Sequence, residues 1–292
     1  MSTALDSAWR AVQTSPGDVH RLEVLADLLL QEGDSFGELI RLELERERHG
    51  GEKLSPAIER HRAHIASTLR HDLGPGDWRQ GFVWSSTGSG CRTLERCLEH
   101  PAFKTVRELE WTFSGEDTPG RIEYALTSLP PTVQGLRLTG DDLAEGSTQW
   151  PNEATGLTQL VTNLPFRLEN ARAEQLRSLF FHPEGLDPGD LIAGLGSAWF
   201  PRMTQLELSL DPTSERWPTS FLSGERCPAL KRLSLSGALM PQHLEDLASS
   251  GLLRGLDELF LDVQHLDQFD EILSDTADRF DHLKRFRRPV PR

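Results

Sequence analysis

Residues 106–111 read VRELEW, with apolar side chains at the first, fourth and sixth positions. The pattern returns six more times, once with threonine at the sixth position: VQGLRL at 133–138, LTQLVT at 157–162, LRSLFF at 176–181, MTQLEL at 203–208, LKRLSL at 230–235 and LDELFL at 256–261. A weaker copy, LKRF, occupies residues 283–286. Successive full copies begin about 19 to 27 residues apart, so one structural unit repeats along the chain.

The recurring pattern predicts a parallel sheet. Side chains alternate between the two faces of a β-strand, so the fourth and sixth positions of each copy face a core and the residues beside them face solvent. The segments between copies predict helices at 91–100, 121–129, 191–195, 221–223, 241–250 and 268–280. A helix between two strands forms a crossover, which keeps the strands parallel. We therefore expect an α/β solenoid, a leucine-rich-repeat horseshoe with a parallel concave sheet and convex helices.

The beginning of the chain lacks the repeat. It predicts a small α-helical domain over residues 1–75, ahead of a leucine-rich-repeat domain over residues 76–292. Apolar residues at helical spacing indicate four amphipathic helices. These are a helix over 2–14, one that follows Asp18, one that begins at Ser35, and one over 55–71. We expect this bundle to pack on the first turn of the solenoid and to shield its apolar end.

Residues 25–42, LADLLLQEGDSFGELIRL, resemble the repeat-companion domain at the start of many bacterial leucine-rich-repeat proteins. That family tends to read YADWLEE-GD-x-x-G-E-x-I-R-L. The matching positions are Ala26, Asp27, Gly33, Asp34, Gly37, Glu38, Ile40, Arg41 and Leu42. Leu25 and Leu29 replace the usual tyrosine and tryptophan. The resemblance is strong over about residues 5–50, extends to Val83, and implies an architecture and a bacterial origin. It implies no activity and no catalytic residues.

Charged residues and a glycine of this helical region lead to three further expectations. Asp27 and Arg41 are expected to form an ion pair that holds the second and third helices together. Residues 43–48 alternate in charge and are expected to form a solvated helix face. Gly37 is expected to mark a close approach of two helices.

The composition limits the classes of partner and the compartment. The chain has 45 acidic and 31 basic residues, a formal charge of −14, which disfavours nucleic acid and anionic membrane as partners. No apolar run approaches the roughly 20 residues that span a bilayer, and no signal peptide is visible. The three cysteines, Cys91, Cys97 and Cys227, provide no disulfide framework. We expect a cytoplasmic protein.

Sequence signatures of catalysis are missing. The histidines His61, His64 and His71 lack the HExxH pattern, and no phosphate loop or GxSxG elbow occurs. Cys91 has no identifiable histidine partner and is expected to be a structural thiol. We expect no catalytic, metal or cofactor site, and no small-molecule substrate is evident.

The outward positions of the predicted strands are the candidate binding surface. Most are polar, but Phe180, Phe260 and Val161 are apolar, and apolar groups on an exposed face suggest a partner. Trp150 lies in a long polar loop over 139–156, a second candidate binding edge. The expected partner-binding residues are Phe180, Phe260, Val161, Arg137, Glu207, His182, Arg232 and Trp150.

The sequence thus predicts a non-catalytic protein–protein interaction module: an adaptor, a regulator or a target-recognition subunit that binds another protein through the concave face. The alternatives are an unrecognised enzyme and a purely structural scaffold. Other interpretations stay open. The phenylalanines and the Trp150 loop could be ordinary surface features, and the basic tail Lys284–Arg292 could be a docking arm, a frayed end or a cap strand that neutralises acidic neighbours. Partner identity, pathway and oligomeric state stay open too.

Overall fold

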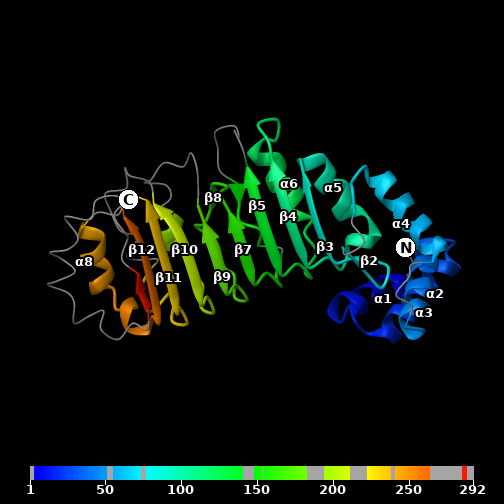
Figure 1. The fold of residues 1–292 in the computed structure, drawn as a ribbon, viewed down its shortest axis with the longest axis horizontal. Helices are drawn as coiled ribbons and strands as arrows, with labels where there is room; N and C mark the ends of the chain where they lie inside the picture. The colour runs from blue at the N-terminus through cyan, green and yellow to red at the C-terminus, as the bar shows by residue number, and fades with distance from the viewer. Residues whose placement is uncertain are drawn as a thin grey trace.

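The computed structural model describes residues 3–50, 55–73, 77–140, 148–152, 154–182, 194–210, 222–237, 241–263 and 285–287. A region of four helices comes first, and an α/β part with a parallel sheet follows it. The helical region lies at one end of the sheet, and the chain crosses the sheet toward the other end (Figure 1). No helix in these described ranges is long and apolar enough to cross a membrane.

The four expected helices are confirmed as α1 (Thr3–Thr14), α2 (Val19–Gln31), α3 (Phe36–Arg48) and α4 (Pro56–Leu69). Two begin at side-chain caps. The Asp18 Oδ1 atom accepts hydrogen bonds from the backbone N–H groups of His20 and Arg21, and the Ser55 Oγ atom accepts one from Ile58. Such caps satisfy N–H groups that have no partner within a helix. Apolar faces of all four helices are buried together.

Helices α2 and α3 approach closely at Gly37. A Cβ atom at this position would lie 2.6 Å from the carbonyl oxygen of Ala26. The expected close helix approach is confirmed, because only glycine leaves room for the neighbouring backbone.

The ion pairs of the helical region differ from the expectation. Asp27 and Arg41 are both exposed, and no ion pair joins them among the described residues. The buried pair is instead Glu43 with Arg62 of α4, at 2.9 Å from Nε to Oε1. Glu43 is 0% exposed, so its assignment to a solvated face was wrong. Alternating charge on α3 could not reveal that α4 covers this face.

A nine-stranded parallel sheet forms the α/β part, with its strands in chain order. Eight strands are β3 (Ser85–Ser89), β4 (Glu108–Phe113), β5 (Gly135–Gly140), β7 (Gln159–Thr162), β9 (Ser178–Phe181), β10 (Gln205–Leu210), β11 (Arg232–Gly237) and β12 (Glu258–Val263). The short β13 (Arg285–Arg287) is the ninth. Every full copy of the sequence pattern supplies one strand, and the weak copy at 283–286 overlaps β13.

The pairing of the strands preserves the sequence pattern. The fourth-position leucines lie opposite one another from strand to strand: Leu109, Leu136, Leu160, Leu179, Leu206, Leu233 and Leu259. One hydrogen-bonded unit recurs just before these strands. The carbonyl oxygen of the second residue of a copy, such as Arg107, accepts two N–H groups of the next copy, here Gln134 at 2.7 Å and Gly135 at 2.9 Å. The register is thus set by the same residues in each copy.

In the described part of the α/β region, the helices lie on one side of the sheet. Behind the strands of Figure 1 lie α5 (Cys91–Glu99) and α6 (Pro119–Thr127), and α8 (Pro241–Ser249) follows β11. They agree with the expected helices 91–100, 121–129 and 241–250. A helical turn covers 194–197, whereas residues 222–223 form a bend instead of the expected helix. The expected helix 268–280 lies outside the described residues.

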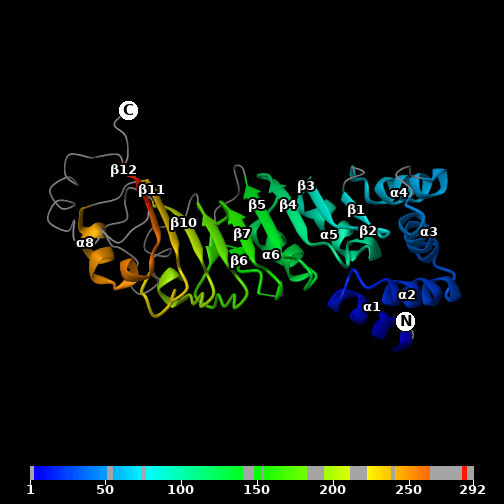
Figure 2. The same ribbon diagram turned by 60° about the horizontal axis from the view of Figure 1, so that its bottom comes forward.

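Short elements complete the α/β part. The pair β1 (Trp78–Arg79) and β2 (Phe82–Val83) is antiparallel, and β6 (Thr148–Gln149) with β8 (Phe166–Arg167) is parallel. Two 3₁₀ turns, η2 (Pro101–Phe103) and η3 (Leu252–Gly255), lead toward β4 and β12. Figure 2 shows α1 to α4 gathered beyond β3 at one end of the sheet.

Aromatic side chains join the helical region to the first strands. The ring of Phe82 lies 6.0 Å from that of Trp9 and 5.3 Å from that of Phe36, edge to face in both cases. His71, just after α4, contacts the sheet: its Nε2 atom lies 2.8 Å from Ser86 Oγ, and its ring packs against Trp111. The helical region is therefore packed on the sheet through a continuous core.

Candidate functional site

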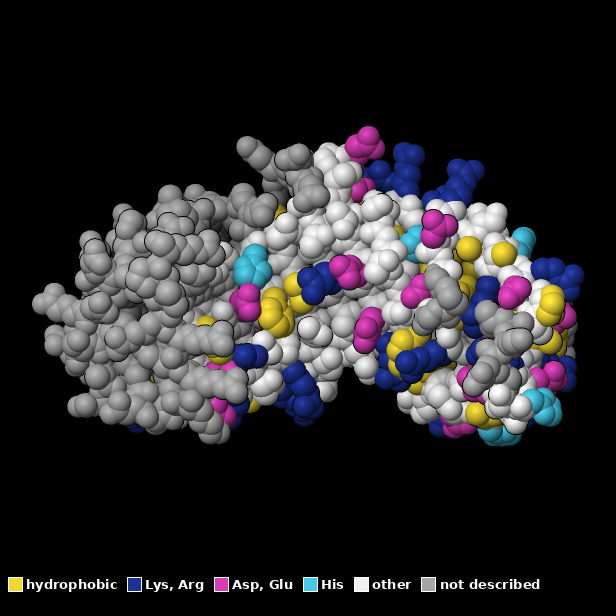
Figure 3. Space-filling model, viewed as in Figure 1, with side chains coloured by type: hydrophobic (Ala, Val, Ile, Leu, Met, Phe, Trp, Pro, Cys, Tyr) yellow, Lys and Arg dark blue, Asp and Glu magenta, His cyan; other side chains and the backbone are white. Residues whose placement is uncertain are grey.

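The face of the sheet opposite the helices carries one row of side chains through its middle. Strand pairing places these residues side by side: Thr87, Glu110, Arg137, Val161, Phe180, Glu207, Ser234 and Phe260. Neighbouring strands lie about 4.8 Å apart, so the row forms a continuous surface. Figure 3 shows this face, with hydrophobic side chains in its middle and charged groups on both sides of them. We call these residues the central row.

Val161 and Phe180 form the apolar part of the central row. They are direct neighbours in the pairing of β7 with β9, and both are half-buried. The sequence predicted large exposed side chains at these positions, whereas neighbouring residues cover part of each. Two adjacent apolar groups in a polar row still form a patch that a partner would remove from water.

Contacts between polar side chains lie on both sides of this apolar patch: an ion pair on one side and a histidine–carboxylate contact on the other. Arg137 Nε lies 3.7 Å from Glu110 Oε1, with side chains 50% and 57% exposed. On the other side, His182 Nε2 lies 3.3 Å from Glu207 Oε1, with side chains 37% and 34% exposed. Exposed pairs of this kind contribute about 0–1 kcal/mol, so they can exchange partners at little cost. The structure therefore brings the predicted site residues Arg137, Glu207 and His182, together with the unpredicted Glu110, near Val161 and Phe180.

Phe260 is separate from the Phe180 patch. Strands β10 and β11 lie between the two phenylalanines, which places them about 14 Å apart at the usual strand spacing. The guanidinium of Arg232 lies 5.0 Å from the centre of the Phe260 ring, and its Nε atom lies 2.9 Å from Glu258 Oε2. Phe260 and Arg232 thus form a second site on the same face.

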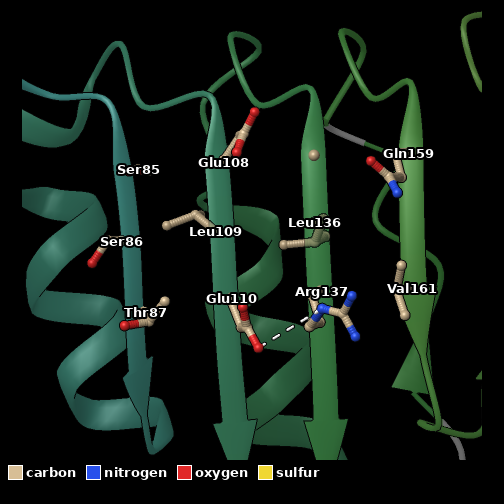
Figure 4. A pocket seen from close by; sticks show the side chains of 11 residues that line it. Ser85, Ser86, Thr87, Glu108, Leu109, Glu110, Leu136, Arg137, Gln159 and Val161 are labelled. Atoms are coloured by element: carbon tan, nitrogen blue, oxygen red, sulfur yellow. Dashed lines mark ion pairs between the residues drawn. The ribbon is translucent and has the colours of Figure 1, made fainter. Parts of the chain in front are cut away.

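A depression of about 280 Å³ lies beside the apolar patch, over β3, β4, β5 and β7 (Figure 4). Its polar lining comes from Ser85, Thr87, Glu108, Glu110, Arg137 and Gln159, and Val161 lines it on the side of the patch. Gly135 lies between Glu108 and Gln159 in the strand register and contributes no side chain. The depression exists because this copy of the repeat has glycine at an outward position.

The sequence reasoning did not select Ser85, Thr87, Glu108 or Glu110 as site residues. A signal was present, because Gly135 is the only glycine at the third position of the seven full copies. A missing side chain on an otherwise covered strand face indicates a hollow. The first strand, Ser85–Ser89, does not carry the pattern, so its two hydroxyl groups could not be placed beside Glu108 and Glu110 in advance.

Trp150 belongs to the core, not to the binding surface. Its side chain is 2% exposed and packs against Phe166 at 6.2 Å and Phe200 at 5.6 Å between ring centres. The prediction that its indole contacts a partner is therefore wrong. A tryptophan in a polar stretch is covered here by residues that lie about 16 and 50 positions further along the chain. Residues 141–147 of the same loop lie outside the described residues.

The three cysteine thiols and the carboxylate of Asp117 are buried. Burial raises the pKa of the thiols of Cys91, Cys97 and Cys227 to about 12. The loop acid Asp117 is 6% exposed, and its Oδ1 atom accepts a hydrogen bond from the Cys91 backbone at 3.0 Å, which caps α5. In the described parts of the chain, no three or more histidine, cysteine, aspartate or glutamate residues cluster as metal ligands would.

No protein-family model matches the chain, and no curated protein matches it.

Proposed function

We propose that the α/β part is a leucine-rich-repeat solenoid, preceded by a repeat-companion domain, and that it binds a protein partner through the central row of the sheet. The repeated register of the leucines and the recurring pair of backbone hydrogen bonds support the solenoid. Each unit of a solenoid contacts mainly its neighbours, so its sheet forms an extended open surface suited to binding.

The adjacent pair Val161 and Phe180 is the observation that carries this proposal. Binding energy in protein interfaces is concentrated in a few aromatic or apolar anchors surrounded by polar groups that exclude water. The central row has this arrangement, since Glu110 and Arg137 lie on one side of the pair and Glu207 lies on the other. A partner would gain affinity by covering the pair and orientation from the charges.

The size of the face is compatible with such an interface. Eight strands at about 4.8 Å spacing span about 34 Å, and strands of six residues are about 20 Å long. The resulting area of about 700 Å² is close to the roughly 800 Å² that each protein contributes to a standard interface. A partner that lies across the strands would use most of this surface.

The test is a pair of substitutions to glutamate. Phe180→Glu places a charge in the apolar patch, and Tyr124→Glu makes a similar change on α6, where Tyr124 is 64% exposed. Partners captured from the native host by in-cell cross-linking would be quantified by mass spectrometry for both variants and for the wild type. Phe180→Glu should reduce capture of the specific partner at least tenfold, about 1.4 kcal/mol, and Tyr124→Glu should not.

The thermal unfolding of both variants serves as the control. If Phe180→Glu folds normally and captures the same partners in the same amounts, the central row is not the binding surface. Unrelated proteins that are cross-linked in the same way serve as controls for nonspecific capture. If the wild type captures the same proteins as these controls and no others, the protein is not a binding module.

A further inference from the structure

We propose that the depression at Gly135 receives a lysine or arginine side chain from an extended segment of the partner, while an apolar side chain of the same segment packs on Val161 and Phe180. This inference rests on the proposed function and names the chemistry of the partner. It follows from the shape, the charge and the position of the depression (Figure 4).

The shape suits a long, unbranched side chain. A Cβ atom on Gly135 would be 3.5 Å from Glu108 Cγ, an ordinary contact, so the space above the glycine is open but narrow. The lysine and arginine side chains have apolar stems that pack along such surfaces while their heads reach polar groups. Val161 borders the depression and would contact the stem.

The charge suits a cation. Glu108 and Glu110 are alternate residues of β4, so their carboxylates leave the same face about 7 Å apart. Glu108 is exposed, and among the described residues it takes part in no ion pair. Among the described residues, Glu110 has one ion pair, the long and exposed contact with Arg137. The lining therefore has one net negative charge and two carboxylates that a partner can reach.

Hydroxyl groups complete the recognition of a basic head. Ser85 and Thr87 lie opposite Glu108 and Glu110 in the strand register. The Ser85 Oγ atom donates a hydrogen bond to Asp77 Oδ1 at 3.2 Å, which leaves its lone pairs to accept one. An ammonium or guanidinium group offers only donors, which matches these acceptors.

The basic groups at and near the depression already contact other side chains, which argues against an acidic occupant. Arg137 is the one basic residue among those that line it, and Glu110 already faces Arg137. Arg79 and Arg107 stack on the ring of Trp84 at 4.2 and 4.5 Å, outside the lining. The formal charge of −14 also favours approach of a basic segment at low salt.

The position of the apolar patch predicts the spacing of the partner's residues. The centre of the depression and the Val161–Phe180 pair are separated by about two strand spacings, roughly 10 Å. In an extended polyproline-II segment, which has three residues per turn and advances about 3.1 Å per residue, residues three positions apart lie on the same side and about 9 Å apart. A segment that crosses the strands should therefore carry its basic and apolar residues three positions apart, in either direction.

The experiment uses the full chain and a phage-displayed library of random dodecapeptides. Selected peptides would be synthesised, and their dissociation constants would be measured by fluorescence anisotropy. Gly135→Val places a branched side chain in the depression, and Gly120→Val on α6 is the matched control because a Cβ there has no neighbour within 4 Å. Glu108→Gln removes one charge, and Glu99→Gln on α5 is its control.

Selected peptides should share a lysine or arginine three positions from an apolar residue. Gly135→Val should weaken the binding of these peptides at least tenfold and Glu108→Gln at least threefold. Both control variants should bind them as the wild type does. The tightest peptide should also lose affinity as salt rises, because its basic head pairs with carboxylates.

Other outcomes separate this inference from the proposed function. Peptides that need Phe180 but carry no basic residue, and that bind Gly135→Val normally, would overturn the inference and leave the binding function intact. A library without any peptide that depends on Phe180 would count against both.

Discussion

Glu43 of α3 and Arg62 of α4 form a buried ion pair in the helical region. The distance from Arg62 Nε to Glu43 Oε1 is 2.9 Å, and the two residues are 8% and 0% exposed. Arg46 Nη2 lies 3.0 Å from the other carboxylate oxygen. The pair joins two helices whose connecting segment includes residues 51–54, so it fixes their packing independently of that segment.

Removal of one member of this pair should destabilise the protein. Arg62→Met leaves the Glu43 charge buried with Arg46 alone, and breaking a buried pair typically costs about 3–5 kcal/mol. The double variant Glu43→Leu with Arg62→Met removes both charges and should recover part of the loss. Urea unfolding of the single and double variants measures both effects. Equal stability of Arg62→Met and the wild type would show that the pair contributes nothing.

Trp150 should behave as a core residue. Trp150→Ala removes a side chain that packs against Phe166 and Phe200, and such truncations cost about 3–5 kcal/mol. Trp199→Ala is the control, since Trp199 is 40% exposed and should cost much less. Thermal unfolding compares the two. A Trp150→Ala variant that is as stable as Trp199→Ala would place Trp150 outside the core.

The stability of the protein should fall as the pH drops below about 6.5. Burial lowers the pKa of His71 and of His100 from the ordinary value of 6.5. The unfolded chain therefore binds protons at a pH where the folded protein does not, and each proton shifts the balance toward unfolding. The free energy of unfolding, measured by urea titration from pH 7.5 to 5.0, should decrease with a slope of at most about 1.4 kcal/mol per pH unit for each histidine.

His100→Asn provides the control for this pH effect. His100 Nδ1 accepts a hydrogen bond from the Ala102 backbone at 3.1 Å, and an asparagine oxygen can accept the same bond without titrating. The variant should lose less stability than the wild type between pH 7.5 and 5.0. An unchanged slope would show that His100 does not contribute.

The cysteine thiols should be unreactive in the folded protein. All three are buried, and burial raises the pKa of each to about 12. The thiolate is the reactive form, so a disulfide reagent at pH 8 should label the native protein very slowly. Labelling of three thiols per chain is expected after denaturation in guanidinium. Rapid labelling before denaturation would show that at least one thiol is accessible.

The sheet was predictable to a large extent because its signal is local. The period-two alternation within each copy predicts which side chains face the core, and the structure confirms it from β4 to β12. The same alternation predicts that Arg137, Val161 and Phe180 point outward, and strand pairing makes them neighbours. The caps at Asp18 and Ser55 were predictable for the same reason, since a cap depends on residues two or three positions away.

The candidate site was predictable only in part. The row came from the repeat, but the degree of exposure of Phe180 and the separate environment of Phe260 depend on neighbouring strands. The depression needs Gly135 from β5 beside Ser85 and Thr87 from β3, and β3 does not carry the sequence pattern. No pattern within one strand indicates what stands two strands away.

The sequence alone therefore determined the parallel sheet, its register and the order of residues along its outward face, because these follow from spacing within single strands. The tertiary structure decided the rest. It buried Glu43 and Trp150, which sequence reasoning had placed in solvent, and it opened a hollow at Gly135 beside two carboxylates. Burial and cavity shape arise from contacts between residues far apart in the chain, and periodicity carries no information about such contacts.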